Sequence, residues 1–555
     1  MTERIYIGVA WPYANGFLHL GHIAGAYLPA DIFARYHRLK GNDVLMVSGS
    51  DSHGTPITVR AEQEGTTPEA VVERYHSQFL KDWQRLGISW DLYTTTGTEN
   101  HKQVAQEMFT RLLEHDYIYK GIVQLPYCDV DKRYLPDRYV NGTCPYCAFQ
   151  GARGDQCDNC GRLLDPQDLK EPYCATHKTT PTFVPREHFY LKLSAFQQPL
   201  LDWMKDKDYW RQNVVNFSRQ FVSRGLNDRS YTRDLTWGVP VPLPGYDDRR
   251  IYVWFEAVCG YLSASKEWAK KQGTPDRWED FWKKDARHYY FIGKDNITFH
   301  TVVWPAMLIG SGDNLNLPYD VPANEFLNIE SGKFSKSRNW AVWVPDYLER
   351  YDPDPLRYVL TAIMPETSDA NFTWQEFVRR NNNELVGTYG NLVHRVLNMT
   401  ATHFEGKMPD PGALDAPSQA IIDHTRAAFD EVGDLIAACH FRQALAACMS
   451  LASEVNRYLD SKEPWKTAKT DRAVTARTLY TALAAISGLR TLVAPVLPFT
   501  SQQLHTMLGF PGTVEQSGWE LTIPAVGQQA QKPKPLFVKL DEEDVVQRET
   551  AKLGA

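Results

Sequence analysis

The sequence has few cysteines, no uninterrupted hydrophobic run of membrane-spanning length and no signal-peptide pattern at its start. Nine cysteines in 555 residues are too sparse for a disulfide scaffold, which favours a reducing compartment. The longest apolar stretch, residues 479–499, is interrupted by Thr481, Arg490, Pro495 and Pro498, as is typical of a buried bundle helix. We therefore expect a cytoplasmic protein without a membrane span.

An excess of positive charge is also absent. Lys and Arg number 60 against 67 Asp and Glu, a net charge of −7, so no global basic field drives binding to nucleic acid or anionic membranes. Any nucleic-acid surface must be local. Hydrophobic residues make up 43% and aromatic residues 12%, which excludes disorder for most of the length. The length itself indicates several domains.

The amino-terminal region has the pattern of a βαβ unit. Residues 5–11 form a near-continuous apolar run, typical of a strand buried on both faces of a parallel sheet. Residues 19–39 carry apolar side chains at helical spacing, and residues 43–48 return as a strand. The alternation resumes with strands predicted over 251–254, 289–293 and 325–329 and helices over 255–271 and 296–309. We predict one α/β doubly wound, Rossmann-type parallel sheet.

The rest of the chain has two other patterns. Residues 117–236 are rich in Pro, Gly and Cys and are predicted to be an irregular insertion. From Trp374 onward the pattern predicts a helical bundle, with helices over 381–399, 418–438, 441–459 and 474–493. Residues 526–535 are predicted to be a polar linker, and 536–540 a last strand or contact segment.

The predicted domains follow from these patterns. They are the first half of the catalytic sheet domain over 1–116, the insertion over 117–236, the second half over 237–325, a connecting segment over 326–373, and the helical domain with its tail over 374–555.

Two motifs indicate phosphate chemistry. His19-Leu20-Gly21-His22 follows the first predicted strand, where a helix start offers backbone N–H groups and a positive dipole end to a triphosphate. His19 and His22 lie on one face of that turn, and Gly21 lets a base or ribose approach the backbone. Lys333-Phe334-Ser335-Lys336-Ser337 places two ammonium groups on a loop of small residues that can close on phosphates.

Together the two motifs resemble the HIGH and KMSKS signatures of class I aminoacyl-tRNA synthetases. The segments 10–16 (AWPYANG), 49–56 (GSDSHGTP), 233–238 (RDLTWG) and 291–295 (FIGKD) resemble the methionyl-tRNA synthetase family, from about Arg4 to Trp465. The resemblance implies activation of methionine with ATP to methionyl-adenylate, then transfer to the terminal adenosine of initiator and elongator methionine tRNAs. It implies ATP with Mg²⁺, and roles in catalysis or ATP binding for His19, Gly21, His22, Lys294, Lys333, Ser335 and Lys336.

A methionine pocket is expected to be an apolar box with aromatic rings beside the sulfur, because the side chain carries no charge. The resemblance places Ala10, Trp11, Tyr13, Trp254, Ala257, Tyr261 and His300 there, with Asp51 holding the substrate ammonium. Trp11, Val258 and Asn296 depart from residues common in the family, which bears on fine specificity. The spacing between the two motifs leaves no room for a large editing domain.

Two pairs of cysteines indicate a structural zinc site. Cys144 and Cys147, then Cys157 and Cys160, give two C-x2-C pairs separated by nine residues, which can close a tetrahedral site. A redox pair is the alternative for one C-x2-C, but two at this spacing favour one zinc per chain. Cys128, Cys174 and His177 offer only three ligands, so we expect unliganded thiols there. Cys259, Cys439 and Cys448 are expected in cores.

For the tRNA anticodon, the resemblance points to Asn391, Arg395 and Trp465, with Trp465 as a stacking platform. Local positive charge is expected from Arg379, Arg380, Arg442, Arg457, Lys462 and Lys466, although a solvated helix face explains each equally well. The zinc-bearing insertion is expected to face the acceptor end. The chain stops without room for a further dimerising domain, so we expect a monomer.

Three alternatives stay open. The first is another class I ligase, for cysteine or leucine. The second is a catalytically silent tRNA-binding protein on a synthetase scaffold, which has no physical reason to keep both histidines and both lysines. The third is a simple nucleotidylyltransferase, which leaves the helical bundle unexplained.

Overall fold

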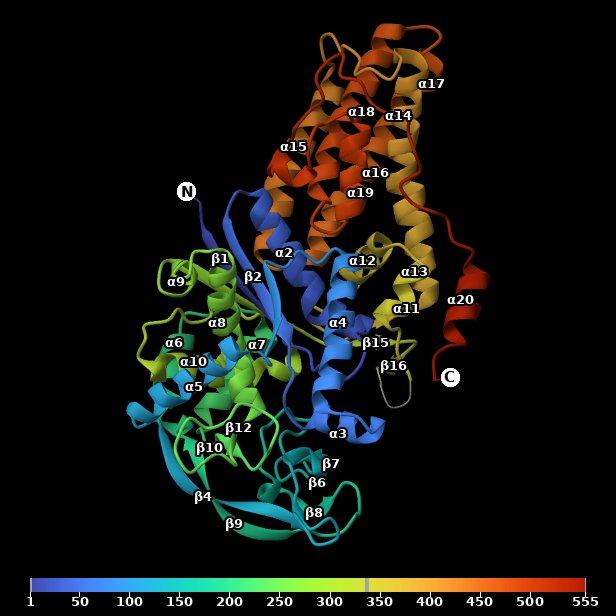
Figure 1. The fold of residues 1–555 in the computed structure, drawn as a ribbon. Helices are drawn as coiled ribbons and strands as arrows, with labels where there is room; N and C mark the ends of the chain where they lie inside the picture. The colour runs from blue at the N-terminus through green and yellow to red at the C-terminus, as the bar shows by residue number, and fades with distance from the viewer. Residues whose placement is uncertain (1, 335–338, 555) are drawn as a thin grey trace.

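A computed structural model describes residues 2–334 and 339–554, so the predicted site residues Ser335 and Lys336 lie outside the described part. The chain is elongated, with a helical bundle at one end, a β-rich insertion at the other and a sheet domain between them (Figure 1). The bundle and the insertion therefore lie far apart, on opposite sides of the sheet domain (Figure 1).

The central sheet is parallel and confirms the predicted fold class. Its order is β14-β13-β1-β2-β3, formed by β1 (Arg4–Val9), β2 (Asp43–Ser50), β3 (Leu92–Thr95), β13 (Ala286–Gly293) and β14 (Ala323–Asn324). Alternate residues of β1 enter two cores: Ile5, Ile7 and Val9 join one, and Tyr6 joins the other. Because β1 pairs with both β2 and β13, the strand order reverses there, and ligands of such sheets bind at this point.

Helices cover both faces of the sheet. After β1 come α1 (Leu20–His22), a π-helical segment (Ile23–Tyr27) and α2 (Leu28–Leu39), as the helical spacing predicts. The other helices of this domain are α3 (Thr55–Glu64), α4 (Pro68–Leu86), α5 (Glu99–Glu114), α8 (Val253–Lys271), α9 (Trp278–Trp282) and α10 (Trp304–Ser311), the last preceded by a second π-helical segment (Phe299–Val303).

Two predicted strands are wrong in part. The strand β12 is only Arg250–Ile251, and α8 already begins at Val253, so Trp254 lies in the first helical turn. The predicted strand over 325–329 is split, because the N–H groups of Glu325 and Phe326 bond to Pro365 O and Asp369 Oδ1 instead of a sheet. Residues after this break form β15 (Leu327–Ile329), which belongs to a different sheet.

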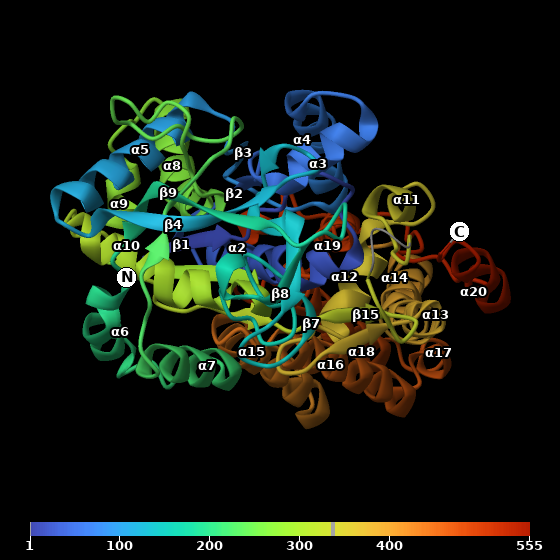
Figure 2. The same ribbon diagram turned by 90° about the horizontal axis from the view of Figure 1, so that it is seen from below.

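The insertion is more regular than predicted. An antiparallel ribbon of β4 (Ile118–Cys128) and β9 (Thr182–Leu191) lies at the end of the sheet domain that faces away from the bundle (Figures 1 and 2). It carries a small sheet of β6 (Val140–Thr143), β7 (Gln150–Arg153) and β8 (Lys170–Cys174). The remaining elements are β5 (Arg133–Tyr134), α6 (Gln197–Met204), α7 (Gln212–Ser223), β10 (Arg229–Ser230) and β11 (Thr232–Arg233).

A connecting segment leads from the sheet to the bundle. It contains a three-stranded sheet of β15, β16 (Gly332–Lys333) and β17 (Ala370–Phe372), and the helices α11 (Val344–Leu348) and α12 (Pro353–Ala362).

The predicted helical bundle is confirmed. Its helices are α13 (Trp374–Arg380), a π-helical segment (Asn381–Gly390), α14 (Asn391–Phe404), α15 (Ala416–Ala437), α16 (Phe441–Lys462), α17 (Pro464–Thr467), α18 (Arg472–Leu492), α19 (Pro498–Met507) and α20 (Glu542–Thr550). In the described residues no helix is long and apolar enough to cross a membrane. Residues 536–540 form no strand; Asn381 and Asn382 donate side-chain hydrogen bonds to the carbonyls of Val538 and Leu540.

One fully buried arginine joins the bundle to the sheet domain. Arg357, on α12, donates to Asp31 Oδ2 of α2 at 2.6 Å and to the carbonyls of Leu86, Pro495 and Val496. Although burial opposes ionisation of Asp31, the guanidinium groups of Arg35 and Arg357 hold the pKa of that carboxyl well below its usual range. The pair is therefore charged, and it links two elements more than three hundred residues apart.

Candidate active site

The two predicted phosphate motifs meet at the start of the helix after β1. The rings of His19 and Phe334 are stacked, with centroids 4.5 Å apart and planes 12° apart. The His19 and His22 rings are stacked at 3.7 Å, and the His19 N–H donates to His22 Nδ1 at 3.1 Å. Because Lys333 directly precedes Phe334, this contact brings the lysine motif to the histidine motif.

Two neighbouring residues have contacts that the sequence did not reveal. A Cβ at Gly21 would lie 3.0 Å from the His19 ring and 3.3 Å from Phe334 Cδ2, so glycine leaves space for the stack itself. Lys294 Nζ donates to Glu325 and Asp369, each at 2.7 Å. Its ammonium is therefore held between two carboxylates, and its predicted part in ATP binding stays a prediction.

The aromatic residues predicted for the amino-acid pocket lie together. Trp254 Nε1–H donates to the Tyr13 hydroxyl at 2.6 Å, and the Trp11 ring meets Tyr261 edge to face at 6.5 Å. His300 Nε2 and the Tyr261 hydroxyl are 2.7 Å apart. Three segments of the chain, the turn after β1, α8 and the second π-helical segment, thus contribute to one cluster.

His300 is held as a neutral imidazole. Burial lowers its pKa to about 4, and its Nδ1 lies 2.9 Å from the Asn296 carbonyl. Because Nδ1–H donates to that carbonyl, Nε2 must accept the hydroxyl hydrogen of Tyr261. Asn296, which differs from the residue common in the family, thus contacts His300 through its backbone carbonyl, a group that any residue at this position supplies. The other two residues predicted for the pocket are Ala10, which directly follows β1, and Ala257, on α8.

Two glycines that the sequence analysis missed make room for Trp11. A Cβ at Gly49, on β2, would lie 2.3 Å from Trp11 Cζ3, and one at Gly260, on α8, would lie 2.8 Å from Trp11 Cε2 and Cζ2. The indole therefore occupies a slot between two backbones. This slot explains how position 11 accommodates a side chain as large as that of tryptophan.

A buried acidic network, also missed, lies beside Asp51. Burial, and next the charge of Glu256, raise the pKa of Asp51 well above its usual range. Asp51 Oδ1 accepts the His53 N–H at 3.2 Å, while Glu256 bonds His53 Nδ1 at 2.9 Å and His101 Nε2 at 3.2 Å. A substrate ammonium would supply the positive charge that ionises Asp51. The only sequence signal was a Glu within an apolar helix.

The four cysteines of the predicted zinc site have the geometry of a metal site. The Sγ atoms of Cys144 and Cys160 are 3.9 Å apart, and those of Cys147 and Cys157 are 3.6 Å apart. Tetrahedral zinc with Zn–S bonds of about 2.3 Å needs Sγ–Sγ distances of about 3.8 Å. The four side chains therefore fit zinc.

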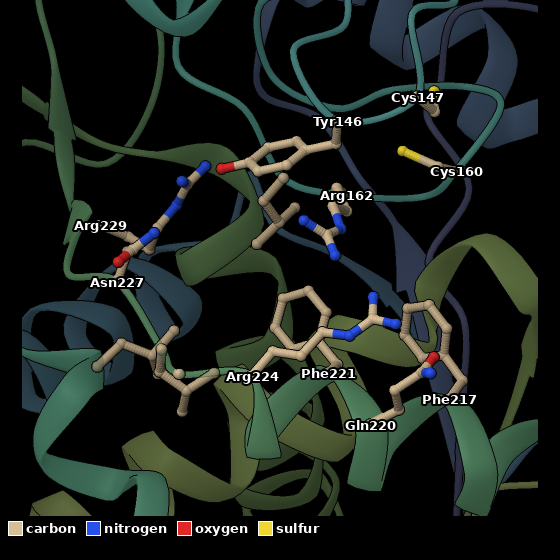
Figure 3. A pocket seen from close by; sticks show the side chains of 14 residues that line it. Tyr146, Cys147, Cys160, Arg162, Phe217, Gln220, Phe221, Arg224, Asn227 and Arg229 are labelled. Atoms are coloured by element: carbon tan, nitrogen blue, oxygen red, sulfur yellow. The ribbon is translucent and has the colours of Figure 1, made fainter.

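A basic and aromatic groove lies next to these cysteines. Tyr146 and Arg162 form one side, with the Arg162 guanidinium 4.3 Å from the Tyr146 ring centroid, and Phe217, Phe221 and Arg224 face them (Figure 3). Tyr146 is 51% exposed. None of the side chains lining the groove in the described part of the chain is acidic. The groove can therefore accept stacked bases and phosphates.

The predicted anticodon residues lie together at the tip of the bundle. Trp465 is 39% exposed, and the Arg395 guanidinium lies 5.3 Å from its ring centroid and 3.0 Å from Asp460 Oδ1. Asn391 is exposed one helical turn before Arg395. Several residues expected to add positive charge are paired with carboxylates, among them Arg379 and Arg380 with Glu376, Lys462 with Asp415 and Lys466 with Glu463.

Comparisons with known proteins cover the whole chain. The family model of class I tRNA synthetases (M) matches residues 5–397, and that of the anticodon binding domain of methionyl tRNA ligase matches residues 408–553. Curated methionine–tRNA ligases of Dehalococcoides mccartyi (strain BAV1) and Thermomicrobium roseum are 58% and 53% identical, each with 100% of both chains covered. A solved Mycobacterium tuberculosis methionyl-tRNA synthetase in complex with methionyl-adenylate has a TM-score of 0.80 at 26% identity, covering 97% of this chain and 100% of that chain.

Proposed function

The chain belongs to the methionyl-tRNA synthetase family, class I ATP-dependent ligases that activate methionine and charge tRNA with it, and from this premise we propose which residues perform each step. The observation that carries the proposal is the stacking of Phe334 on His19, which joins the two phosphate motifs. No covalent enzyme intermediate is needed. The methionine carboxylate attacks the α-phosphorus of ATP, and pyrophosphate leaves.

His19, His22, Lys333 and Lys336 stabilise the charge that develops on the transferring and departing phosphates. His22 Nδ1 accepts the backbone N–H of His19, which puts the proton of the neutral ring on Nε2, the nitrogen that donates to phosphate in this proposal. Gly21, Ser335 and Lys294 are assigned to ATP binding in this proposal. Mg²⁺ bound to ATP would neutralise part of the phosphate charge.

Methionine binds in the aromatic cluster around Trp11, Tyr13, Trp254, Tyr261 and His300, with its ammonium on Asp51. The neutral His300 and the fixed Tyr261 hydroxyl supply polar edges without a charge, which suits a thioether. The His53 N–H bonds Asp51 Oδ1 and positions that carboxylate, and Glu256 holds the His53 ring.

For tRNA, Asn391, Arg395 and Trp465 read the anticodon at one end of the molecule. The groove between Tyr146 and Arg224 takes the single-stranded acceptor end at the other, because bases stack on aromatic rings and phosphates pair with arginines. The Cys144, Cys147, Cys157 and Cys160 zinc site holds one wall of this groove and takes no part in the chemistry.

Both initiator and elongator methionine tRNAs are substrates in this proposal, and the ligase acts as a cytoplasmic monomer. Light scattering should give a mass near 63.5 kDa; a mass twice as large would contradict the monomer.

ATP–pyrophosphate exchange without tRNA, across methionine, leucine, isoleucine, valine, cysteine and homocysteine, tests the pocket and the reaction together. We expect methionine to lead. Exchange led by leucine or cysteine would make Trp11, Val258 and Asn296 specificity switches toward that amino acid. Binding of tRNA without any exchange would leave the silent scaffold, and exchange without tRNA binding the nucleotidylyltransferase.

A further inference from the structure

Trp343, in the connecting segment, lies directly against the histidine motif. Its ring meets the His19 ring edge to face, with centroids 6.1 Å apart and planes 61° apart. The His19 ring also stacks on His22 at 3.7 Å and on Phe334 at 4.5 Å. Because two nearly parallel rings at these distances take up the two faces of the imidazole, Trp343 lies at its rim.

The main chain holds Trp343 and His19 side by side. The two residues form an antiparallel bridge, and the Val344 N–H donates to the Leu18 carbonyl at 2.8 Å. Each is the extended residue that precedes a helix, α1 for His19 and α11 for Trp343. These bonds are made by backbone groups, so a substitution of the Trp343 side chain leaves the pairing in place and changes the packing on the imidazole.

Asn339 orients the indole of Trp343. Trp343 Nε1–H donates to Asn339 Oδ1 at 2.9 Å. The backbone of Asn339 is left-handed (φ 48°), a conformation that asparagine adopts more readily than most residues. Its carbonyl accepts the Gly554 N–H at 3.0 Å, near the carboxyl end of the chain. The residue that accepts the indole N–H is therefore itself bonded through its main chain.

The orientation of the His19 ring depends on this packing. The torsion that turns an imidazole about its bond to Cβ has only a broad preference, so the neighbours of the ring determine how it lies. Stacked rings resist tilting of the imidazole, and a ring at the rim resists sliding in its plane. A displacement of about 1 Å can lower the rate of a reaction about 10²-fold. The contact with Trp343 therefore bears on the chemistry at His19.

We propose that Trp343 is a positioning residue for the reaction. It holds the imidazole of His19 in the orientation that meets the phosphates of ATP, and Asn339 holds Trp343 in place. This inference rests on the role that the proposed function gives to His19. Because Trp343 acts on the phosphate side of the site, its loss should lower kcat and leave the KM for methionine nearly unchanged.

The first test is ATP–pyrophosphate exchange by variants of the full chain. Trp343→Leu should lower kcat about 10- to 100-fold and change the methionine KM by less than about twofold. Trp343→Phe keeps a ring beside His19 and loses one hydrogen bond, so its kcat should fall by about two- to tenfold. Wild-type kcat in Trp343→Leu, or a loss confined to the methionine KM, would overturn the proposal.

Trp519→Phe is the matched control. Trp519 Nε1–H donates to the Phe429 carbonyl at 2.8 Å, and its ring meets Tyr36 edge to face at 4.9 Å. The substitution therefore removes the same kind of bond beside the same kind of contact, away from the histidine motif, and kcat should stay at the wild-type value. An equal fall in kcat in Trp519→Phe and Trp343→Phe would show a general effect of losing an indole and would contradict the proposal.

The role of Asn339 is tested by combining substitutions. Asn339→Gly removes the acceptor of the indole N–H and accepts the left-handed backbone. Because Asn339→Gly and Trp343→Phe remove the same hydrogen bond, the double variant should be no slower than the slower single variant. Losses of kcat that multiply would refute the support of Trp343 by Asn339.

The decisive measurement repeats Trp343→Leu without the imidazole. His19→Asn should itself lower kcat, and adding Trp343→Leu should lower it by less than a further twofold or so, because no imidazole is left to position. A further loss as large as in the wild-type background would show that Trp343 acts through the fold, and would overturn the proposal. Wild-type exchange in His19→Asn would instead refute the role of His19 and this inference with it.

Circular dichroism and urea unfolding show whether each variant is folded. If Trp343→Leu does not fold, Trp343→Phe takes its place in the comparison of the two backgrounds. The smaller loss expected for Trp343→Phe should then disappear in His19→Asn, and its persistence would overturn the proposal.

Discussion

The slot that holds Trp11 can be tested by adding a single methyl group to its wall. In Gly260→Ala the new Cβ would lie 2.8 Å from Trp11 Cε2 and Cζ2, about 0.8 Å short of ordinary carbon–carbon contact. We expect the Trp11 side chain to shift rather than the α8 backbone, which would change the shape of the aromatic cluster. Overpacking of this kind costs about 1–3 kcal/mol, roughly a five- to 150-fold change in an equilibrium constant.

We expect the methionine KM in ATP–pyrophosphate exchange to rise about tenfold in Gly260→Ala, with a smaller change in the ATP KM. Gly25→Ala is the matched control, because a Cβ there meets nothing within 4 Å. Trp11→Leu should relieve the contact, so the double variant should cost at least 1 kcal/mol less than the two single changes added together. Additive effects, or a Gly260→Ala enzyme indistinguishable from Gly25→Ala, would refute the assignment of Trp11 to the pocket.

Three further predictions concern the phosphate site, the bundle tip and the domain junction. His22→Asn keeps an acceptor for the His19 N–H but removes the phosphate donor, so kcat of exchange should fall about 10²- to 10³-fold while circular dichroism stays unchanged. Trp465→Ala should lower kcat/KM for tRNA charging roughly 5- to 150-fold, which corresponds to about 1–3 kcal/mol of lost stacking, and should leave amino-acid activation intact. Loss of both activities would contradict its role. Arg357→Met should lower the free energy of unfolding by about 3–5 kcal/mol at pH 7, measured with urea. The folded pKa of Asp31 is below its unfolded value, so this stabilisation is present above about pH 4 and is lost as the pH falls. An equal loss of unfolding free energy at pH 7 and at about pH 3 would refute the charge argument.

The sequence predicted the sheet and the bundle because their signals are strong and local. The first strand is buried on both faces, and the helix after it has a clear helical spacing. Val253 and Trp254 were assigned to the wrong element because a short apolar run does not distinguish a buried strand from a buried helical turn. The long strands β4 and β9 were missed because they are half exposed and contain Gly121, Pro126 and Pro185.

The candidate site residues divide in the same way, into those with a strong local signal in the sequence and those without one. Residues with distinctive chemistry in a motif, such as His19 and Cys144, could be assigned by type and spacing. Gly49 and Gly260 could not, since each acts on Trp11, which is distant in sequence and close only after folding.

The junction at Arg357 also has a consequence for biosynthesis. Asp31 leaves the ribosome with the first helix of the chain, whereas Arg357 and the carbonyls of Pro495 and Val496 follow hundreds of residues later. Until then Arg35 is the guanidinium partner of this carboxylate among the residues that the structure describes. Part of the packing of α2 is also missing until then, because α2 contacts the bundle helix α15 and the hydrophobic core around α2 continues into the bundle. The sheet domain therefore cannot complete its contacts with the bundle until the carboxyl-terminal helices have been synthesised.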